Sequence, residues 1–238
     1  MSNTFLQIGV TSGRSFEGVD VEDIDIIDAS KVRLRNVRAN RIRFIRNCRD
    51  IEIDGFRLTG RRAMPLMAQA PAFYLQGLHL CNGYIDCAEA LDTTGDLQAI
   101  SFRAALMESI SIHDIWINNH CRNALAMYKQ QSSKWRDIDV HHLYVTNGRD
   151  ISNSGTAGAL HFGSDADPGH LAENCRVHDC LVRDTAGFGV RHKNYGMQVS
   201  NILGPNEHQL YGSPNPLGGE TAEDIHLRVI MRTAALLN

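Results

Sequence analysis

A short hydrophobic pattern recurs along most of this 238-residue chain. In each copy two apolar residues flank one polar residue, and a second triplet of the same form usually follows after a short polar break. The first triplets are Ile24-Asp25-Ile26, Ile51-Glu52-Ile53, Leu78-His79-Leu80, Ile110-Ser111-Ile112, Ile138-Asp139-Val140, Cys175-Arg176-Val177 and Ile225-His226-Leu227. They start 27, 27, 32, 28, 37 and 50 residues apart, and the last interval divides into 24 and 26 if Val199 opens a weaker copy. Such alternation predicts strands with one buried face, and its repetition predicts a stack of similar coils.

Each coil contains more than one such triplet. Ile115-Trp116-Ile117 and Leu143-Tyr144-Val145 follow the first triplets of their coils. A third set comprises Ile100-Ser101-Phe102, Leu125-Ala126-Met127, Leu160-His161-Phe162 and Phe188-Gly189-Val190. Helical periodicity is weak, and the spacing of ankyrin or leucine-rich repeats is absent. The pattern therefore predicts an all-β chain with three short strands per coil.

With this repeat the chain resembles the pectate-lyase-like superfamily, which includes polysaccharide lyases, polygalacturonase-type hydrolases and phage tailspike depolymerases. The resemblance covers roughly residues 19 to 233. It implies a right-handed, single-stranded parallel β-helix of about eight or nine coils. We expect residues 1–18 to form an N-terminal cap or lead-in and residues 19–238 to form the β-helix domain.

Composition and charge disfavour several classes of protein. A net charge of -3 and a pI near 6.4 are not typical of a nucleic-acid binder, which usually carries a strongly basic domain. No apolar segment has the length of a signal peptide or of a membrane span, so we expect neither Sec export nor membrane insertion. The six cysteines form no C-x-x-C pair, and we interpret them mainly as buried thiols in a reducing setting.

Aligning the coils turns each corner into a column of residues spaced by about 4.8 Å. The column after the first strand reads Asp54, Cys81, His113, His141, His178 and Arg228. Three imidazoles in succession suit zinc, copper or nickel, or a pH-sensitive surface. The alternative is a polar ladder that is hydrogen-bonded to its neighbours, and we favour this interpretation. We therefore predict no metal site and no cofactor, while a divalent cation stays open.

The second corner carries residues that suit turns with a left-handed backbone. They are Thr59-Gly60, Asn118-Asn119, Thr146-Asn147 and Arg183-Asp184. Because Asn, Asp and Gly tolerate this conformation, we predict a structural role for the second corner.

The outward face of the third strand, called here the third-strand face, is the predicted substrate surface, because the resembled superfamily usually binds substrate there. We expect Phe102, Met127, Phe162 and Val190 to point inward. One outward column then reads Arg103, Tyr128, Gly163 and Arg191, and the next reads Ser101, Ala126, His161 and Gly189. Arg41 and Arg43 lie on the same face in an earlier coil. An aromatic ring flanked by cations suits an acidic sugar. The predicted substrate-binding residues are Arg103, Tyr128, Lys129, His192 and Lys193.

The widest coil carries an excursion, Ser164–His170, directly after its third strand. The excursion places Asp165 and Asp167 beside His161 and one coil from Arg191. In a glycoside hydrolase the two aspartates would act as acid and base. In a polysaccharide lyase Arg191 or Lys129 would remove the proton, with His161 or Tyr128 donating to the leaving oxygen. The alternative is an ordinary Asp-x-Asp-Pro-Gly turn. The predicted catalytic residues are His161, Asp165, Asp167 and Arg191.

The segment Gly189–Asn194 resembles the arginine-histidine strand of the chondroitinase B and alginate lyase family. The catalytic lysine of that family, expected about one coil earlier, has no counterpart here, because Lys129 lies two coils back. The resemblance therefore implies lyase chemistry for this strand without supplying its complete catalytic set.

Our leading hypothesis is a tailspike-like carbohydrate-active protein that binds and cleaves a polysaccharide, with an acidic one as the first candidate, by lyase or hydrolase chemistry. The alternative is a non-catalytic structural or adhesive solenoid that binds glycan or protein. We expect a polysaccharide partner, neither nucleic acid nor membrane as a partner, and a homo-oligomer, with a trimer to be tested first. Synthesis in the cytoplasm and association with a virion fit the missing signal peptide, although the sequence leaves the location open.

Overall fold

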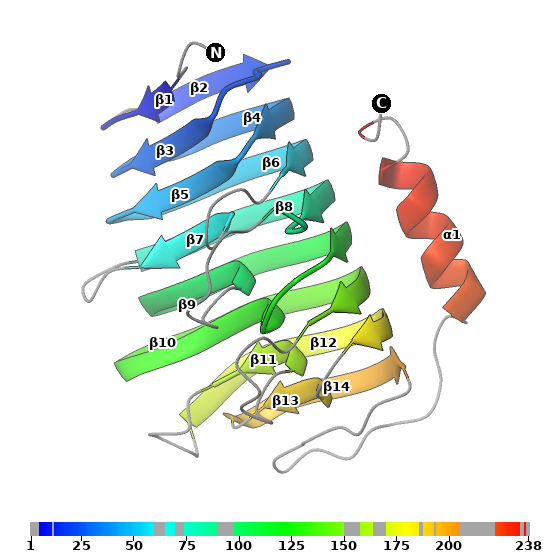
Figure 1. Ribbon diagram of the computed structural model, residues 1–238. Coiled ribbons are helices and arrows are strands. Elements are labelled where there is room, and N and C mark those ends of the chain that lie inside the picture. The colour runs from blue at the N-terminus through cyan, green and yellow to red at the C-terminus, as the bar shows by residue number, and fades with distance from the viewer. Residues whose placement is uncertain are drawn as a thin grey trace.

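The computed structural model describes residues 5–10, 12–59, 65–69, 74–89, 98–149, 158–163, 170–185, 188–192, 194–204, 222–233 and 236. Within these ranges the chain forms one curled sheet of 14 strands and one helix, α1 (Ala222–Thr233) (Figure 1). Every strand pairing between these residues is parallel. The expectation of an all-β chain is confirmed, and the arrangement is consistent with a β-helix.

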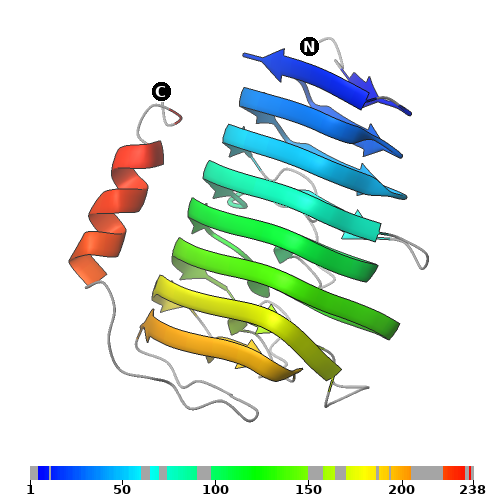
Figure 2. The same cartoon turned by 180° about the vertical axis from the view of Figure 1, so that it is seen from behind.

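The first series of strands forms one side of the curled sheet, which faces the viewer in Figure 2. In order along the stack it comprises β2 (Ser12–Glu17), β4 (Ser30–Ala39), β6 (Cys48–Leu58), β8 (Tyr74–Asp86), β9 (Gln98–Asn118), β10 (Asn123–Gly148), β12 (His170–Thr185) and β14 (Asn194–Leu203). Most of these strands are long because the first two triplets of each coil run on through the corner as one strand.

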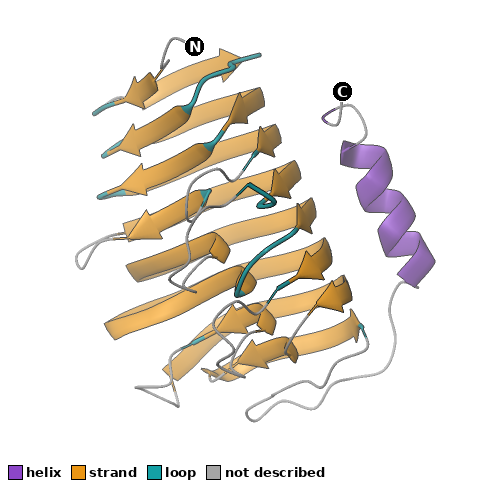
Figure 3. Ribbon diagram, in the orientation of Figure 1, coloured by secondary structure: helices purple, strands orange, loops and turns teal. Residues whose placement is uncertain are grey.

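The second series corresponds to the predicted third strand and faces the viewer in Figure 3. It comprises β1 (Phe5–Ile8), β3 (Asp23–Ile27), β5 (Arg41–Ile45), β7 (Leu66–Gln69), the opening segments of β9 and β10, β11 (Gly158–Phe162) and β13 (Phe188–His192). β9 and β10 pair within both series, so they join the two sides of the sheet.

A single hydrophobic core runs along the stack, and its residues come from both series. In two of its columns a small residue stands next to a large aromatic ring. Ala68 lies between Phe44 and Phe102, whose ring centroids are 6.0 Å apart at 77°. Gly83 follows Phe56 in another column, and a Cβ atom at Gly83 would lie 2.0 Å from the Phe56 ring. The core therefore depends on complementary volumes in adjacent rows.

The corners depend on residues that accept a left-handed backbone. The first corner has φ of 52° at Asn36, 53° at Asn82, 54° at Asp114 and 49° at Asp179. The second corner has positive φ at Asn119, Asn147 and Asp184. Asn and Asp tolerate this region better than other side chains. The predicted turn role of the second corner is confirmed for these residues, whereas Gly60 lies outside the described residues.

Two of the predicted triplets are placed wrongly. Ile24-Asp25-Ile26 lies in β3, in the second series, and the strand that pairs with Ile51 is the one containing Val32. Ile225-His226-Leu227 lies in α1, so Arg228 does not continue the first corner, and Ser200 occupies that position next to His178. The intermediate triplets are in the predicted register. A further copy does lie in β14, but it opens at Met197, which pairs with Cys175, and not at Val199, which pairs with Val177.

The helix α1 packs against the outer side of the first series. Ile225 and Val229 are fully buried against Tyr144 and Leu181, and Trp116 borders the contact. Apolar residues four positions apart make one face of a helix, which explains why this segment is helical. Within the described ranges, no helix combines the length and the apolar character needed to cross a membrane.

The six cysteines are all buried, and they are thiols rather than disulfides. Burial is the main cause that raises the pKa of Cys48 and Cys175 to about 11 and that of Cys180 to about 12. These thiols are therefore protonated near neutral pH, and the prediction that they are buried is confirmed.

Candidate functional site

Arg103, Tyr128 and His161 form a cluster on the third-strand face, because β9, β10 and β11 place them in three consecutive rows. The Arg103 Cζ atom lies 4.6 Å from the centroid of the Tyr128 ring. The Tyr128 and His161 ring centroids are 5.2 Å apart at 54°. Gln98 Nε2 donates to the Tyr128 hydroxyl at 2.8 Å, and this hydroxyl donates to Asn123 Oδ1 at 3.3 Å. The phenol is thus fixed between a cation and an imidazole.

The centre of this cluster is enclosed. Ser101, Ala126 and His161 are 0%, 0% and 5% exposed, although the sequence places them on an outward column. Among the described residues, no hydrogen-bond partner reaches the buried Ser101 Oγ, Gln98 Oε1 or Arg103 Nε atoms. Buried polar atoms normally have partners, so such atoms mark a place where a ligand or water would bind.

The predicted register of β13 is shifted by two residues. Val190 pairs with Leu160, so Arg191 pairs with His161 and His192 pairs with Phe162. The prediction that Val190 stands next to Phe162 is therefore wrong, and so is the placing of Arg191 in the column of Arg103. The shift puts the Arg191 backbone beside His161.

The side chains of six predicted site residues lie outside the described part of the structure: Lys129, Asp165, Asp167, Arg191, His192 and Lys193. The structure therefore brings together Arg103, Tyr128 and His161 from the predicted set.

The basic residues of the earlier coil are on the predicted face but are already paired. Arg43 lies in the same outward column as Ser101 and forms two contacts of 2.5 and 2.6 Å with Asp25. Arg41 forms an ion pair of 2.7 Å with Asp23. The hydrogen bond that Arg43 donates to Asp25 is the largest cause that raises the pKa of Arg43. The sequence contained a signal for these pairs, because Asp23 and Asp25 have the same spacing as Arg41 and Arg43 and lie one row earlier.

The histidine column, His113, His141 and His178, is confirmed by the pairing of β9, β10 and β12. The rings of His113 and His141 stack with centroids 4.8 Å apart and planes 2° apart. Those of His141 and His178 stack at 5.1 Å and 12°. His79, from a different column, meets the His113 ring edge-on at 5.0 Å. His79 was not among the predicted metal-binding candidates, because it lies two residues before the corner.

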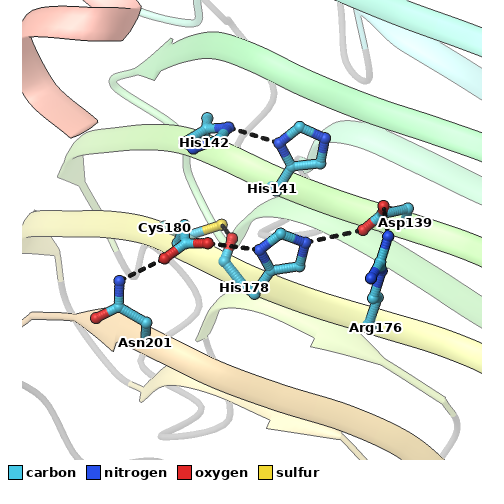
Figure 4. Close-up of polar contacts among 8 residues, drawn as sticks. Asp139, His141, His142, Arg176, His178, Cys180 and Asn201 are labelled. Atoms are coloured by element: carbon cyan, nitrogen blue, oxygen red, sulfur yellow. Dashed lines mark hydrogen bonds and ion pairs between the residues drawn. The ribbon is translucent and has the colours of Figure 1, made fainter. Parts of the chain in front are cut away.

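The lower end of the column is saturated with hydrogen bonds (Figure 4). His178 contacts Asp179 Oδ2 through Nδ1 at 2.6 Å and Asp139 Oδ1 through Nε2 at 3.1 Å. Arg176 also binds Asp139, at 2.6 Å. Burial opposes ionisation of Asp139, but the hydrogen bond and charge of Arg176 outweigh it and lower the pKa. Both nitrogens of His178 are therefore committed to carboxylates.

His141 is uncharged near neutral pH. Burial is the largest cause that lowers its pKa to about 4, and the neighbouring rings of His113 and His142 act in the same direction. The Nδ1 atoms of His141 and His142 are 2.5 Å apart, so one of them donates to the other. A neutral stacked ring can tolerate this spacing, whereas adjacent imidazolium ions would repel. These contacts support the polar-ladder interpretation for the lower end of the column.

A cavity of about 410 Å³ opens on the first series, beside the upper end of the histidine column. Its lining includes Arg33, Glu52 and His79. Arg33 Nε is 2.9 Å from Glu52 Oε2, and Arg35 contacts the other oxygen of the same carboxylate at 3.1 Å. The cavity is therefore polar, with charges of both signs.

Comparison of the chain with protein-family models, curated proteins and solved structures finds no match. The function is accordingly inferred from the two clusters of side chains themselves, the Arg103–Tyr128–His161 cluster and the histidine column.

Proposed function

We propose that the chain is a right-handed, single-stranded parallel β-helix of the pectate-lyase-like kind. Three features support this proposal: parallel pairing of each strand with its counterpart in the next row, left-handed residues at the corners, and one continuous core. A homotrimer is the assembly we propose to test first, by sedimentation of the purified protein.

We propose that the third-strand face binds an acidic polysaccharide at the Arg103–Tyr128–His161 cluster. The observation that supports this most is the guanidinium of Arg103 over the Tyr128 ring, beside buried polar atoms that lack partners. A guanidinium binds a carboxylate with two hydrogen bonds, and an aromatic ring packs against a sugar ring. The unsatisfied Ser101 and Gln98 atoms would pair with sugar hydroxyls.

Elimination at a uronic acid is the reaction that the described residues suit best. In that reaction a base takes the proton next to the carboxylate, the glycosidic C–O bond breaks, the leaving oxygen takes up a proton to become a hydroxyl, and a carbon–carbon double bond remains. Arg103 would neutralise the carboxylate, and His161 is the proton-transfer group of the described cluster. Hydrolysis would need two carboxylates, and the candidates Asp165 and Asp167 lie outside the described residues.

A second candidate is a binding module without turnover. The enclosure of His161 and the two hydrogen bonds of the Tyr128 hydroxyl favour it, because a buried, engaged cluster can hold a sugar without transferring protons. Both candidates predict binding at the same residues, so product analysis separates them.

The test is incubation with a panel of acidic and neutral polysaccharides, followed by ultraviolet absorbance of unsaturated products and by reducing-end assays. We expect absorbance to rise with an acidic polymer for the wild type and for Arg183→Gln, whose side chain is exposed at the second corner. We expect Arg103→Gln to lose roughly tenfold or more in affinity for that polymer. Binding without products identifies the module, reducing ends alone identify a hydrolase, and equal affinity of the two variants contradicts the site.

A further inference from the structure

The upper end of the histidine column gathers three metal-binding side chains. His79 and Cys81 come from β8, and His113 comes from β9 in the next row. One donor atom from each lies within 4.8 Å of the others. His79 is exposed, His113 is partly exposed and Cys81 is buried, so the group spans the surface. In the part of the chain that the structure describes, these three side chains form the group whose spacing suits a metal ion.

The surroundings orient these donors as in metal centres. Asp114 Oδ2 accepts from His113 Nδ1 at 2.9 Å, which fixes the tautomer and leaves Nε2 of that ring as the acceptor. A carboxylate behind a ligating histidine is the usual outer partner in zinc sites. Asp54 Oδ1 lies 3.6 Å from Cys81 Sγ and also accepts from Asn82 Nδ2 at 2.6 Å.

Carboxylates lie beside the donors. Asp54 contacts Cys81 and Asp114 contacts His113, whereas Glu52 is already paired with Arg33 and Arg35. Burial and the Asp54 carboxylate raise the pKa of Cys81 to about 12, so the thiol keeps its proton unless a cation replaces it. Metal binding deprotonates coordinating thiols, even ones of high pKa.

The two ends of the histidine column differ in this respect. At the lower end, both nitrogens of His178 contact carboxylates, so no lone pair faces a neighbouring donor. At the upper end, His79 borders the cavity of about 410 Å³, which would give a bound ion access to water or to a small ligand. Three protein ligands with one accessible position are typical of catalytic rather than purely structural zinc sites.

We propose that His79, Cys81 and His113 bind one divalent transition-metal ion of the zinc class, with the Cys81 proton released to solvent and a fourth position open to the cavity. Metal–ligand bonds of about 2.0–2.3 Å in a tetrahedral site put donor atoms roughly 3.5 Å apart. The donor atoms lie within 4.8 Å of one another, and rotation of the exposed His79 side chain would bring them to this shorter spacing. The site is on the first series and is independent of the proposed polysaccharide face.

Cobalt titration of the metal-free protein tests the site, since Co²⁺ bound to a thiolate gives a charge-transfer band. We expect the band to saturate at one equivalent in the wild type and to be bleached by Zn²⁺. Cys81→Ala should lose the band, and His79→Ala should lower the Co²⁺ affinity at least tenfold. The matched controls are Cys175→Ala, another buried thiol, and His178→Ala, two rows below His113. Both should keep the band and an affinity close to the wild type.

Circular dichroism first verifies that each variant is folded. Because the His79 side chain is exposed, His79→Ala is the variant expected to disturb the fold least. The proposal is overturned if the wild type shows no band at one equivalent. It is equally overturned if Cys81→Ala retains the band, or if His178→Ala lowers the affinity as much as His79→Ala. Because no polysaccharide enters this experiment, its failure leaves the third-strand face untouched.

Discussion

The lower end of the histidine column and the third-strand face satisfy their polar groups differently. At the lower end of the column, imidazole, carboxylate and amide groups bind one another: His178 with Asp139 and Asp179, and Asn201 with Asp179 at 2.5 Å. On the third-strand face, Ser101 Oγ and Arg103 Nε are buried without partners among the described residues.

The difference separates a ladder of hydrogen bonds that stabilises the fold from a surface suited to binding a ligand. A satisfied buried polar group contributes roughly 0.5–1.5 kcal/mol per hydrogen bond, whereas an unsatisfied one costs about 1–3 kcal/mol. Residues of the ladder should therefore matter for the free energy of unfolding. Unsatisfied residues should lower stability in the absence of a ligand, which is a cost that functional sites commonly carry.

The largest expected effect belongs to His120, a buried imidazole that sharpens the contrast. Neither ring nitrogen has a partner among the described residues, and burial, assisted by the charge of Arg149, lowers the pKa to about 4 from 6.5. Between these values the unfolded chain binds a proton that the folded chain does not. Stability due to His120 is thus complete above pH 6.5 and is lost as the pH falls to about 4, by about 3 kcal/mol.

Urea unfolding of the wild type and of His120→Leu across this pH range measures the effect. The difference in unfolding free energy between the two proteins should change with a slope of up to about 1.4 kcal/mol per pH unit, which corresponds to one proton. His178→Asn provides the comparison for a ring whose nitrogens both have partners. NMR titration of the wild type should show a neutral His120 ring between pH 4 and 6.5. A constant difference between wild type and variant would contradict the assignment.

Asp179 tests the ladder itself. It accepts from His178 and Asn201, and it has φ of 49°. Asp179→Ala removes these acceptors and places Ala in the left-handed region, so we expect a loss of roughly 2 kcal/mol. Asp179→Asn keeps an acceptor and the conformational tolerance, and should lose less than half as much. Denaturant unfolding at neutral pH makes the measurement, and equal losses in both variants would show that the hydrogen bonds contribute little.

The sequence predicted the rows well because strand alternation is local, and it predicted the histidine column because parallel register copies the sequence spacing into space. The error at Ile24 arose because each coil holds several similar triplets, so an interval of 27 residues also matched a strand of the other series. The error at Ile225 arose because a triplet as short as Ile225-His226-Leu227 fits the alternation of a strand and also the period of a helix. The spacing of Ile225 and Val229, buried together on α1, distinguishes the helix.

The candidate sites were less predictable than the rows. His79 reaches His113 from a different column, and such a contact depends on side-chain rotamers that alternation does not specify. The pairing of Arg41 with Asp23 and of Arg43 with Asp25 needed the register of β3 and β5, which the misplaced Ile24 triplet obscured. The shift at Val190 moved Arg191 beside His161 for a similar reason. Local patterns thus place strands, while cross-row contacts need the register of every coil.

The smallest expected effect is that of removing one buried hydroxyl group. Its sign should differ between a hydroxyl without a partner and one that is hydrogen-bonded. Ser101→Ala removes a buried hydroxyl without a partner, so we expect the free energy of unfolding to rise by about 1 kcal/mol. Thr146→Val is the matched change at a satisfied site, because Thr146 Oγ1 accepts from Trp116 Nε1 at 2.9 Å and donates to Asn118 Oδ1 at 3.0 Å. It should lower the free energy of unfolding by about 1–2 kcal/mol.

Thermal and urea unfolding of both variants without ligand give these two signs, and binding of an acidic polysaccharide supplies a second readout. If Ser101 is kept for a ligand, Ser101→Ala should be more stable and yet bind the polymer more weakly, whereas Thr146→Val should be less stable and bind as the wild type does. A destabilised Ser101→Ala would show that the hydroxyl already has a partner in the folded chain. In that case the third-strand face would be as saturated as the lower end of the histidine column, and the contrast between these two regions would no longer indicate where a ligand binds.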